Sequence, residues 1–349
     1  MAPSTESGDR STSGRRIVTV IGPGRSGTST LAGALAHCGF EVPGRAIRGN
    51  ATNPVGFYEP RWVVDYHREL LKRLHVGTID SAPEALEIVS RAMEGSPDRD
   101  RLRDWLAGRL EEQPRLVVKD PRSIWFQGTW ISLAHELDAQ LGFVTMLRHP
   151  AEVSASRKKY YSKSEEQRSR DAEIARISGW VNGLLTAELV SRGSSRAFVR
   201  YSDLITDWRD VLGVVGEALQ VAYDPDISAP VHPVDDFIDP SLHRVSVGWS
   251  DIDVPDALRD IGERVWQTLS GAAEHGEQEG FTDAADRLRT EYARMCADAR
   301  ALTLQSGVRS RVAARRRGEA RARREMGAAS SSVSDLKGRL RQMLIRGKS

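Results

Sequence analysis

The sequence has few of the features that mark secreted, metal-binding or membrane proteins. Only two of its 349 residues are cysteines, Cys38 and Cys296, so we expect no disulfide framework, no zinc site and a reducing, cytoplasmic compartment. No run approaches the roughly 20 apolar residues that a membrane-spanning helix needs. Residues 1–15 are rich in Ser, Thr, Gly and charge and lack the apolar centre of a secretory signal. We predict that they form a disordered lead.

The formal net charge of +2 conceals a strong asymmetry. From Arg309 to Ser349 there are 13 Lys and Arg against 3 Asp and Glu, which leaves 37 against 45 before residue 309. We predict a helical, Arg-rich tail over residues 286–349 that ends in a basic amphipathic segment, Leu336–Ile345. That segment suits weak, peripheral contact with the inner face of a membrane, and a solvated tail is the alternative. Nucleic acid is not an expected partner, because no aromatic residues alternate with the arginines.

Short apolar runs alternate with helical stretches before that tail. The runs are rich in β-branched or aromatic residues and predict buried parallel strands at Ile17–Ile21, Leu116–Val118, Gly142–Leu147 and Ala197–Val199. The helical stretches are Ser29–Cys38, Arg61–Leu74, Ala85–Leu110, Val153–Tyr161 and Asp171–Ser191. This alternation predicts an α/β fold over residues 16–285, a P-loop-type parallel sheet flanked by helices. Ligands of such sheets bind at the carboxyl ends of the strands.

A glycine-rich loop follows the first predicted strand. Gly22-Pro-Gly-Arg-Ser-Gly-Thr-Ser-Thr30 leads into a helical stretch, an arrangement in which backbone N–H groups and a helix N-terminus cradle an anion. Gly22 and Gly27 have the P-loop spacing, but Thr28 stands where a nucleotide triphosphatase has Lys. The strongest cation is Arg25, and no acidic strand end suits Mg²⁺. The loop therefore favours a sulfuryl donor, which carries less charge than a terminal phosphoryl group and needs no metal. A glycine turn without a ligand is the alternative.

Two segments resemble the donor-binding motifs of PAPS-dependent sulfotransferases. Pro23-Gly-Arg-Ser-Gly-Thr-Ser29 resembles the family's 5′-phosphosulfate loop, usually written Pro-Lys-Ser-Gly-Thr-Thr. Arg148, followed by His-Pro and by Ser156 eight residues later, resembles its 3′-phosphate motif. The resemblance spans residues 16–208 and implies the P-loop fold, PAPS as the donor and no metal. It implies that the phosphosulfate is bound by Arg25, Ser26, Gly27, Thr28 and Ser29. Arg148 and Ser156 would bind the 3′-phosphate.

Three further segments are similar to parts of that family, the first two to its carbohydrate-modifying and bacterial branch and the third to the family's Tyr-Glu-Asp-Leu segment. They are Asn53-Pro-Val-Gly-Phe-Tyr-Glu-Pro60, Val117-Val-Lys-Asp-Pro-Arg122 and Phe198-Val-Arg-Tyr-Ser-Asp-Leu204. They imply an acceptor hydroxyl on a carbohydrate or glycolipid, and Tyr201 as a further donor-binding residue. The Lys-Thr-His segment that carries the base in other members is absent, as is their basic Arg-Lys-Gly segment. The base is therefore open.

A base must bring a carboxylate or imidazole within hydrogen-bonding distance of the acceptor hydroxyl. Glu59 is the first candidate, from the match to the carbohydrate branch, and Asp120 is the second, because it follows a strand into the cleft. Lys119 would assist at the bridging oxygen or bind the acceptor, and Arg122 would clamp the acceptor. Alternatively, Glu59 is an acidic residue at a helix N-terminus. Lys119, Asp120 and Arg122 would then belong to an internal ion network.

The sequence therefore predicts an enzyme that moves a sulfuryl group from PAPS to a carbohydrate or glycolipid hydroxyl, by in-line transfer with a carboxylate base. Two other interpretations are open. A P-loop kinase of a small molecule would depend on MgATP. A non-catalytic protein with a nucleotide-binding fold, acting through its basic tail, would bind PAP and show no turnover.

Overall fold

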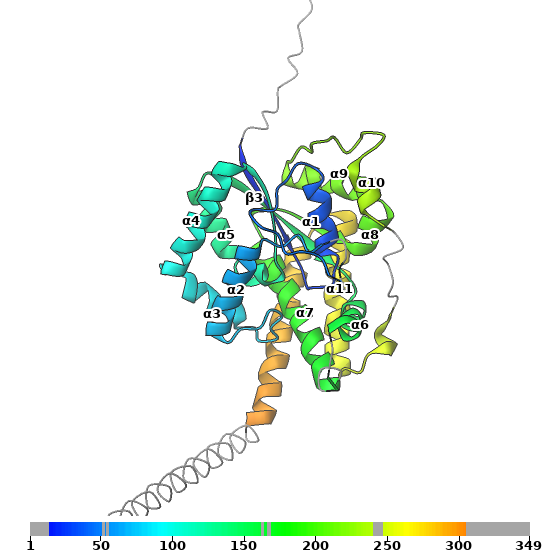
Figure 1. The fold of residues 1–349 in the computed structure, drawn as a ribbon. Coiled ribbons are helices and arrows are strands. Elements are labelled where there is room, and N and C mark those ends of the chain that lie inside the picture. Colours follow the sequence, from blue (N-terminus) through cyan, green and yellow to red (C-terminus); the bar gives the residue numbers. More distant parts are fainter. Residues whose placement is uncertain are drawn as a thin grey trace, which may run out of the picture. The chain divides into compact units, whose positions relative to one another are not determined.

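The chain divides into two compact units, Met1–Ala293 and Arg294–Ser349. The computed structural model describes residues 14–50, 53, 56–161, 164–165, 169–239 and 247–304 (Figure 1). Residues 281–304 are helical, and the side chains of Leu288 and Tyr292 are buried, so the first unit extends beyond residue 285. The predicted amphipathic segment and the arginine clusters of the tail lie outside the described residues. None of the helices in the described ranges is long and apolar enough to cross a membrane.

Within the described residues the first unit contains one sheet of four parallel strands, in the order β2-β1-β3-β4. The strands are β1 (Arg15–Ile21), β2 (Arg115–Lys119), β3 (Ala139–Leu147) and β4 (Ser195–Arg200). Each predicted apolar run lies within one strand, and the structure extends β2 and β4 beyond the run at both ends and β1 and β3 only at the start. β1 lies between β2 and β3, so the loop that follows it opens at the point where the chain changes direction across the sheet.

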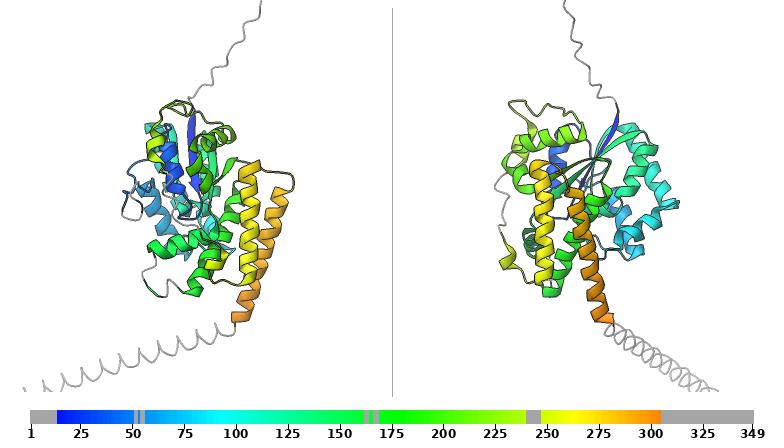
Figure 2. Two further views of the ribbon diagram at one scale, coloured as in Figure 1. Left: turned by 90° about the vertical axis from the view of Figure 1, so that its right-hand side faces the viewer. Right: turned by 180° about the vertical axis from the view of Figure 1, so that it is seen from behind.

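The sheet is buried on both faces, which explains why its strands are apolar at most positions, with the β-branched Thr19 and Thr145 as buried polar exceptions. Ile17 and Ile21 belong to the core on one face, whereas Val18 and Val20 belong to the core on the other. The first face is covered by α2 (Arg61–Leu74), α3 (Ala85–Met93), α4 (Pro97–Glu112) and α5 (Gln127–Glu136). The second is covered by α1 (Thr28–Ala36), α8 (Tyr201–Thr206), α9 (Trp208–Leu219) and α10 (Pro233–Phe237). Figure 2 shows these two groups of helices on opposite flanks of the sheet.

The remaining elements are distributed over the unit, with α11 (Asp256–His275) at the β4 edge and η1 (Pro121–Trp125) against α2 and α3. α11 packs on α7 and β4. The bounds of these elements are α6 (Pro150–Tyr161), α7 (Arg170–Val190) and α11 (Asp256–His275), with the 3₁₀ turns η1 (Pro121–Trp125) and η4 (Trp249–Asp251). The predicted α/β fold class, with a parallel sheet flanked by helices, is confirmed.

The helical stretch predicted over Ala85–Leu110 is divided in the structure. It contains two helices, because α3 ends at Met93 and α4 begins at Pro97. Gly95 has φ of 57°, a left-handed conformation that ends a helix. The side chain of Ser96 accepts a hydrogen bond from the backbone N–H of Arg99 and caps α4. Proline in the first turn cannot continue the preceding helix but fits the start of a new one.

Candidate functional site

The loop from Gly22 to Ser29 connects β1 to α1 and depends on glycine at two positions. Gly22 has φ of 141°, and a Cβ there would lie 2.7 Å from the carbonyl oxygen of Met146 on β3. Gly27 has φ of 85°, and a Cβ there would lie 2.2 Å from Cδ2 of Tyr201. Only glycine fits both the backbone conformation and the space at these points. The loop is therefore packed directly against β3 and against the start of α8.

The end of the loop presents hydrogen-bond donors to one place. The first α1 hydrogen bond runs from the Leu31 N–H to the Gly27 carbonyl, so the N–H groups of Gly27, Thr28 and Ser29 have no partner within the helix. The Ser26 N–H is not available, because it donates to the carbonyl of Pro23 at 3.1 Å. The Ser26 hydroxyl is fully buried and has no hydrogen-bond partner among the described residues. These donors form a cradle that suits an anion.

Arg25 joins the loop to the predicted 3′-phosphate motif. Its φ of 80° is unusual for a residue with a side chain and marks a strained position of the kind that clusters at ligand sites. The Arg25 Nε donates to the Ser156 hydroxyl on α6 at 3.1 Å, and Arg148 donates to the Arg25 carbonyl at 3.2 Å. The structure thus brings together the two motifs, which lie more than a hundred residues apart in the sequence.

Arg148 is itself held in a fixed position. It is 8% exposed, and its Nε donates to the Glu152 carboxylate on α6 at 2.8 Å. Its guanidinium carbon lies 4.9 Å from the ring centroid of Tyr201, a cation–π geometry. Arg157 reaches the same loop from α6, since its Nη1 would lie 3.3 Å from a Cβ on Gly24. The β3 side of the loop is therefore strongly cationic.

A second group of residues contacts the loop from the β2 side. Lys119, at the end of β2, donates to the Ser29 hydroxyl at 3.2 Å and to the Glu59 carboxylate at 2.6 Å. Asn53 also donates to Ser29, at 3.3 Å. The side chains of Lys119 and Glu59 are 3% and 12% exposed. They form a nearly buried ion pair that touches the first turn of α1.

The backbone around Glu59 is fixed by the segment that precedes it. The Ile47 N–H donates to the Glu59 carbonyl at 2.8 Å, and the Arg61 N–H donates to the Arg45 carbonyl at 2.9 Å. Tyr58 has φ of 52° and packs edge-on against Phe237, with ring centroids 5.5 Å apart. Glu59 is thus placed by a rigid turn directly before α2.

Asp120, which was expected to face the cleft, lies in the interior of the protein. It is fully buried, and its Oδ2 lies 2.8 Å from Nδ1 of His67 on α2. Its Oδ1 accepts from the Arg122 guanidinium at 2.7 Å and from the Arg122 N–H at 3.1 Å. Both oxygens are therefore engaged, and the carboxylate orients Arg122, whose side chain is 19% exposed.

The electrostatics of that cluster fix its protonation. Burial alone would raise the pKa of Asp120, but the hydrogen bond with His67 and the charge of Arg122 outweigh it and hold the pKa below its ordinary value. Burial lowers the pKa of His67 in spite of the same hydrogen bond. At neutral pH Asp120 is therefore ionised, and neutral His67 donates its Nδ1–H to it. A buried carboxylate with a depressed pKa accepts protons poorly.

The structure gathers the residues expected at the donor around one loop and adds three that the sequence did not reveal. Arg25, Ser26, Gly27, Thr28, Ser29, Arg148, Ser156 and Tyr201 are on or beside the loop. Glu59 and Lys119 adjoin it, and Asp120 and Arg122 form the next cluster. The additional residues are Asn53, His67 and Arg157. Among the described residues, no group of three or more His, Cys, Asp or Glu side chains is arranged to hold a metal ion.

Comparison with known proteins gives only distant likenesses. No protein-family model matches the chain, and no curated protein matches it. The sulfotransferase domain from the Synechococcus PCC 7002 olefin synthase is 19% identical, covers 74% of this chain and 95% of that chain, and superposes with a TM-score of 0.41. The sulfotransferase domain from the curacin biosynthetic pathway is 15% identical, covers 73% of this chain and 97% of that chain, and also has a TM-score of 0.41. Likenesses this distant carry no weight for function, which rests on the residues of this chain.

Proposed function

We propose that this protein is a sulfotransferase that moves a sulfuryl group from PAPS to a hydroxyl of a carbohydrate or glycolipid. One observation carries the proposal: a single glycine loop is contacted on one side by Arg148 and on the other by the Lys119–Glu59 pair. An anion-binding cradle, a second cationic site and a carboxylate base are the three parts that such a transfer requires.

The residues present fit a donor with two anionic groups. The orphaned Ser26 hydroxyl and the N–H groups at the start of α1 would hold the phosphosulfate. Gly27 keeps that cradle clear of a side chain. Arg148, with the Ser156 hydroxyl beside it through Arg25, would hold the 3′-phosphate. When bound, PAPS would supply an activated sulfuryl group with PAP as the leaving group.

Glu59 is the base in this proposal. Its carboxylate is partly exposed and adjoins the loop through Lys119, whereas Asp120 is fully buried and has both oxygens engaged. We therefore assign Asp120 a positioning role, in which it orients Arg122 toward the acceptor. The bidentate fork of a guanidinium suits a carboxylate or paired hydroxyls of an acceptor.

The reaction balances without a further reactant. The acceptor oxygen forms a bond to sulfur while the bond from sulfur to the 5′-phosphate oxygen breaks, and that oxygen keeps the electron pair. Glu59 takes the proton of the acceptor hydroxyl. As Glu59 becomes neutral, Lys119 loses its counterion, and its positive charge is then available to offset the charge that grows at the loop. The Lys119 Nζ, 3.2 Å from the Ser29 hydroxyl, links the base to the donor cradle.

Calorimetry with PAP, ATP and adenylyl sulfate, each with and without Mg²⁺, tests the donor. We expect PAP to bind without metal and more tightly than the other two. Arg148→Ala should weaken PAP binding by about tenfold or more, because it removes charge-assisted hydrogen bonds. Arg68→Ala, which removes an exposed arginine paired with Asp65, is the matched control and should leave binding unchanged.

The same experiment separates the alternatives. MgATP binding with no preference for PAP would refute the sulfotransferase and favour a kinase. PAP binding without sulfation of any acceptor in a carbohydrate and glycolipid screen would favour a non-catalytic binding protein. Metal-independent PAP binding, together with sulfation that Glu59→Gln abolishes, is the outcome we expect.

A further inference from the structure

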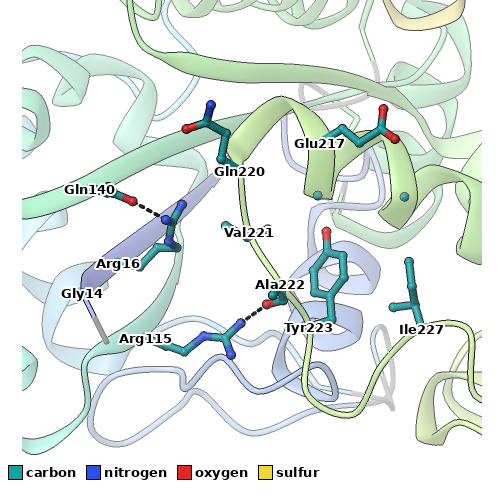
Figure 3. Close-up of a pocket in the computed structure, with 12 residues that line it drawn as sticks. Gly14, Arg16, Arg115, Gln140, Glu217, Gln220, Val221, Ala222, Tyr223 and Ile227 are labelled. Carbon is teal, nitrogen blue, oxygen red and sulfur yellow. Dashed lines mark hydrogen bonds between the residues drawn. The ribbon is translucent and has the colours of Figure 1, made fainter. Parts of the chain in front are cut away.

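A pocket lies at the opposite end of the sheet from the loop. Its volume is about 980 Å³, and it is formed where the strands begin and where α9 ends (Figure 3). Arg16, Arg115 and Gln140 contribute from the first residues of β1, β2 and β3. Arg16 is six residues before Gly22, so at about 3.3 Å per residue the pocket lies roughly 20 Å from the donor loop. It is a separate site.

Two arginines stand side by side in this pocket. Arg16 and Arg115 are directly paired in the register of β1 and β2. Like charges on neighbouring strands repel each other. Burial, reinforced by the charge of Arg115, lowers the pKa of Arg16. Burial also lowers the pKa of Arg115, although Asp224 opposes it. An anion between the two guanidinium groups would relieve this repulsion.

The hydrogen-bond partners of these arginines are neutral. Arg16 donates to the Leu219 carbonyl at 2.8 Å and to the Gln140 side chain, and Arg115 donates to the Ala222 carbonyl (Figure 3). Asp224 acts on Arg115 through its charge, but within the described part of the chain it forms no ion pair with either guanidinium. Glu217 also lines the pocket but forms no such pair. The two positive charges are therefore held in place and are only partly offset.

The rest of the pocket can accommodate the uncharged part of a ligand. Gly213 and Gly216 lie on the α9 wall, and Val221 and Ile227 line the loop beyond it. A Cβ on Gly213 would meet no atom within 4 Å, so this part of the wall is open. Gly216 is covered by the ring of Tyr223, which would lie 3.0 Å from its Cβ. The wall is therefore smooth and partly apolar next to the cationic pair.

We propose that this pocket binds a small phosphate monoester, with the phosphate between Arg16 and Arg115 and the organic body along α9 at Gly213. Two adjacent guanidinium groups match the charge of a phosphate dianion and can donate to it in pairs. Because Arg16 and Arg115 also hold the carbonyls of Leu219 and Ala222, bound phosphate would fix the end of α9 to the sheet. The site depends on none of the residues that hold the sulfuryl donor.

The test uses phenyl phosphate and inorganic phosphate in calorimetry, with chloride at matched ionic strength as the reference. The full chain carries Gly27→Ala and Arg148→Ala, so that phosphate binding is suppressed both at the cradle, which Gly27 keeps clear of a side chain, and at the proposed 3′-phosphate site. We expect both phosphates to bind, and phenyl phosphate to bind more tightly because its ring uses the open wall. Arg115→Gln should weaken both by about tenfold or more, since it removes a charged donor.

A second variant keeps the proposal testable if Arg115→Gln unfolds the protein. Gly213→Leu removes no contact and fills the open wall, so it should weaken phenyl phosphate by about tenfold and inorganic phosphate by much less. Arg91→Gln, on α3 and paired in solvent with Glu87, is the control and should change neither. Phosphate binding that survives Arg115→Gln, or phenyl phosphate binding unaffected by Gly213→Leu, would overturn the proposal. These outcomes are independent of whether wild-type protein binds PAP.

Discussion

Replacing Lys119 by methionine leaves the Glu59 carboxylate without its partner in a nearly closed site. The pair is 2.6 Å apart, with the two side chains 3% and 12% exposed. At an effective dielectric constant of about 20, the attraction at this distance is roughly 6 kcal/mol, part of which offsets the cost of desolvation. Removing one partner from such a pair typically costs about 3–5 kcal/mol. We expect Lys119→Met to lower the free energy of unfolding by an amount in that range.

The substitution of the other partner, Glu59→Gln, should lower the free energy of unfolding by a smaller amount. Glu59→Gln keeps an oxygen that can accept from Lys119, so one hydrogen bond survives although the charge is lost. The double variant Lys119→Met/Glu59→Gln contains neither charge and should be more stable than the sum of the single changes predicts, with a coupling of about 1–3 kcal/mol. The midpoint of urea unfolding, at an unchanged slope, measures each value.

The control for this cycle is an ion pair of the same type in solvent. Arg91→Met removes a partner of Glu87 on α3, where the side chains are 76% and 59% exposed, and it should shift the midpoint little. If Lys119→Met is no more destabilising than Arg91→Met, or if the two changes at Lys119 and Glu59 add without coupling, the pair does not have the role assigned to it. In turnover, Glu59→Gln should lower kcat by about 10²–10⁴-fold while PAP still binds.

Three further outcomes follow from the described contacts. Burial lowers the pKa of His67 below 6.5 in the folded state. As the pH falls below 6.5, the unfolded chain therefore binds a proton at His67 that the folded protein does not bind, and the folded protein loses stability until the pH reaches the folded pKa. The His67→Gln variant should lose less stability than wild type between pH 7 and 5 in urea unfolding. Gly27→Ala should destabilise the fold by about 1–3 kcal/mol and weaken PAP binding, because its Cβ would lie 2.2 Å from the Tyr201 ring. Gly108→Ala, with open space around it, should be neutral or stabilising, and equal effects at the two glycines would contradict this reasoning. Arg25→Gly should leave the free energy of unfolding unchanged or raise it, because glycine adopts the φ of 80° without strain. The same variant should bind PAP about tenfold more weakly in calorimetry. Unchanged PAP binding would show that Arg25 does not belong to the donor site.

The sheet could be predicted from the sequence because its signals are local. A strand buried on both faces is apolar at nearly every position, and the segments around Val18, Val117, Val144 and Val199 follow that pattern without competing helical periodicity. The break between α3 and α4 is also local. Gly95-Ser-Pro97 carries both a stop signal and a cap, but the helical pattern on either side of it masked the boundary.

The side-chain contacts that join distant segments of the chain at the site could not be predicted in this way. His67 and Asp120 lie 53 residues apart, and no periodicity or spacing connects an α2 histidine to the end of β2. The same holds for Lys119 and Ser29, which meet only because β2 ends and α1 begins at the same edge of the sheet. Motifs indicate which residues take part, whereas their pairing depends on packing between distant segments. This is why Asp120 is a candidate base from the sequence, whereas our proposal, which takes its contacts into account, gives it an orienting role.

The strand order has a consequence for how acceptor preference can change in this protein. β1 separates the Lys119 and Glu59 side, which faces the acceptor in our proposal, from the Arg148 and Ser156 side, which faces the donor. Substitutions in the turn before α2 or in η1 can therefore alter one half while the other keeps its own supporting contacts. Such a layout is modular, and it would let new acceptors be selected by exchanging residues 45–60 and 120–126 within an unchanged donor framework.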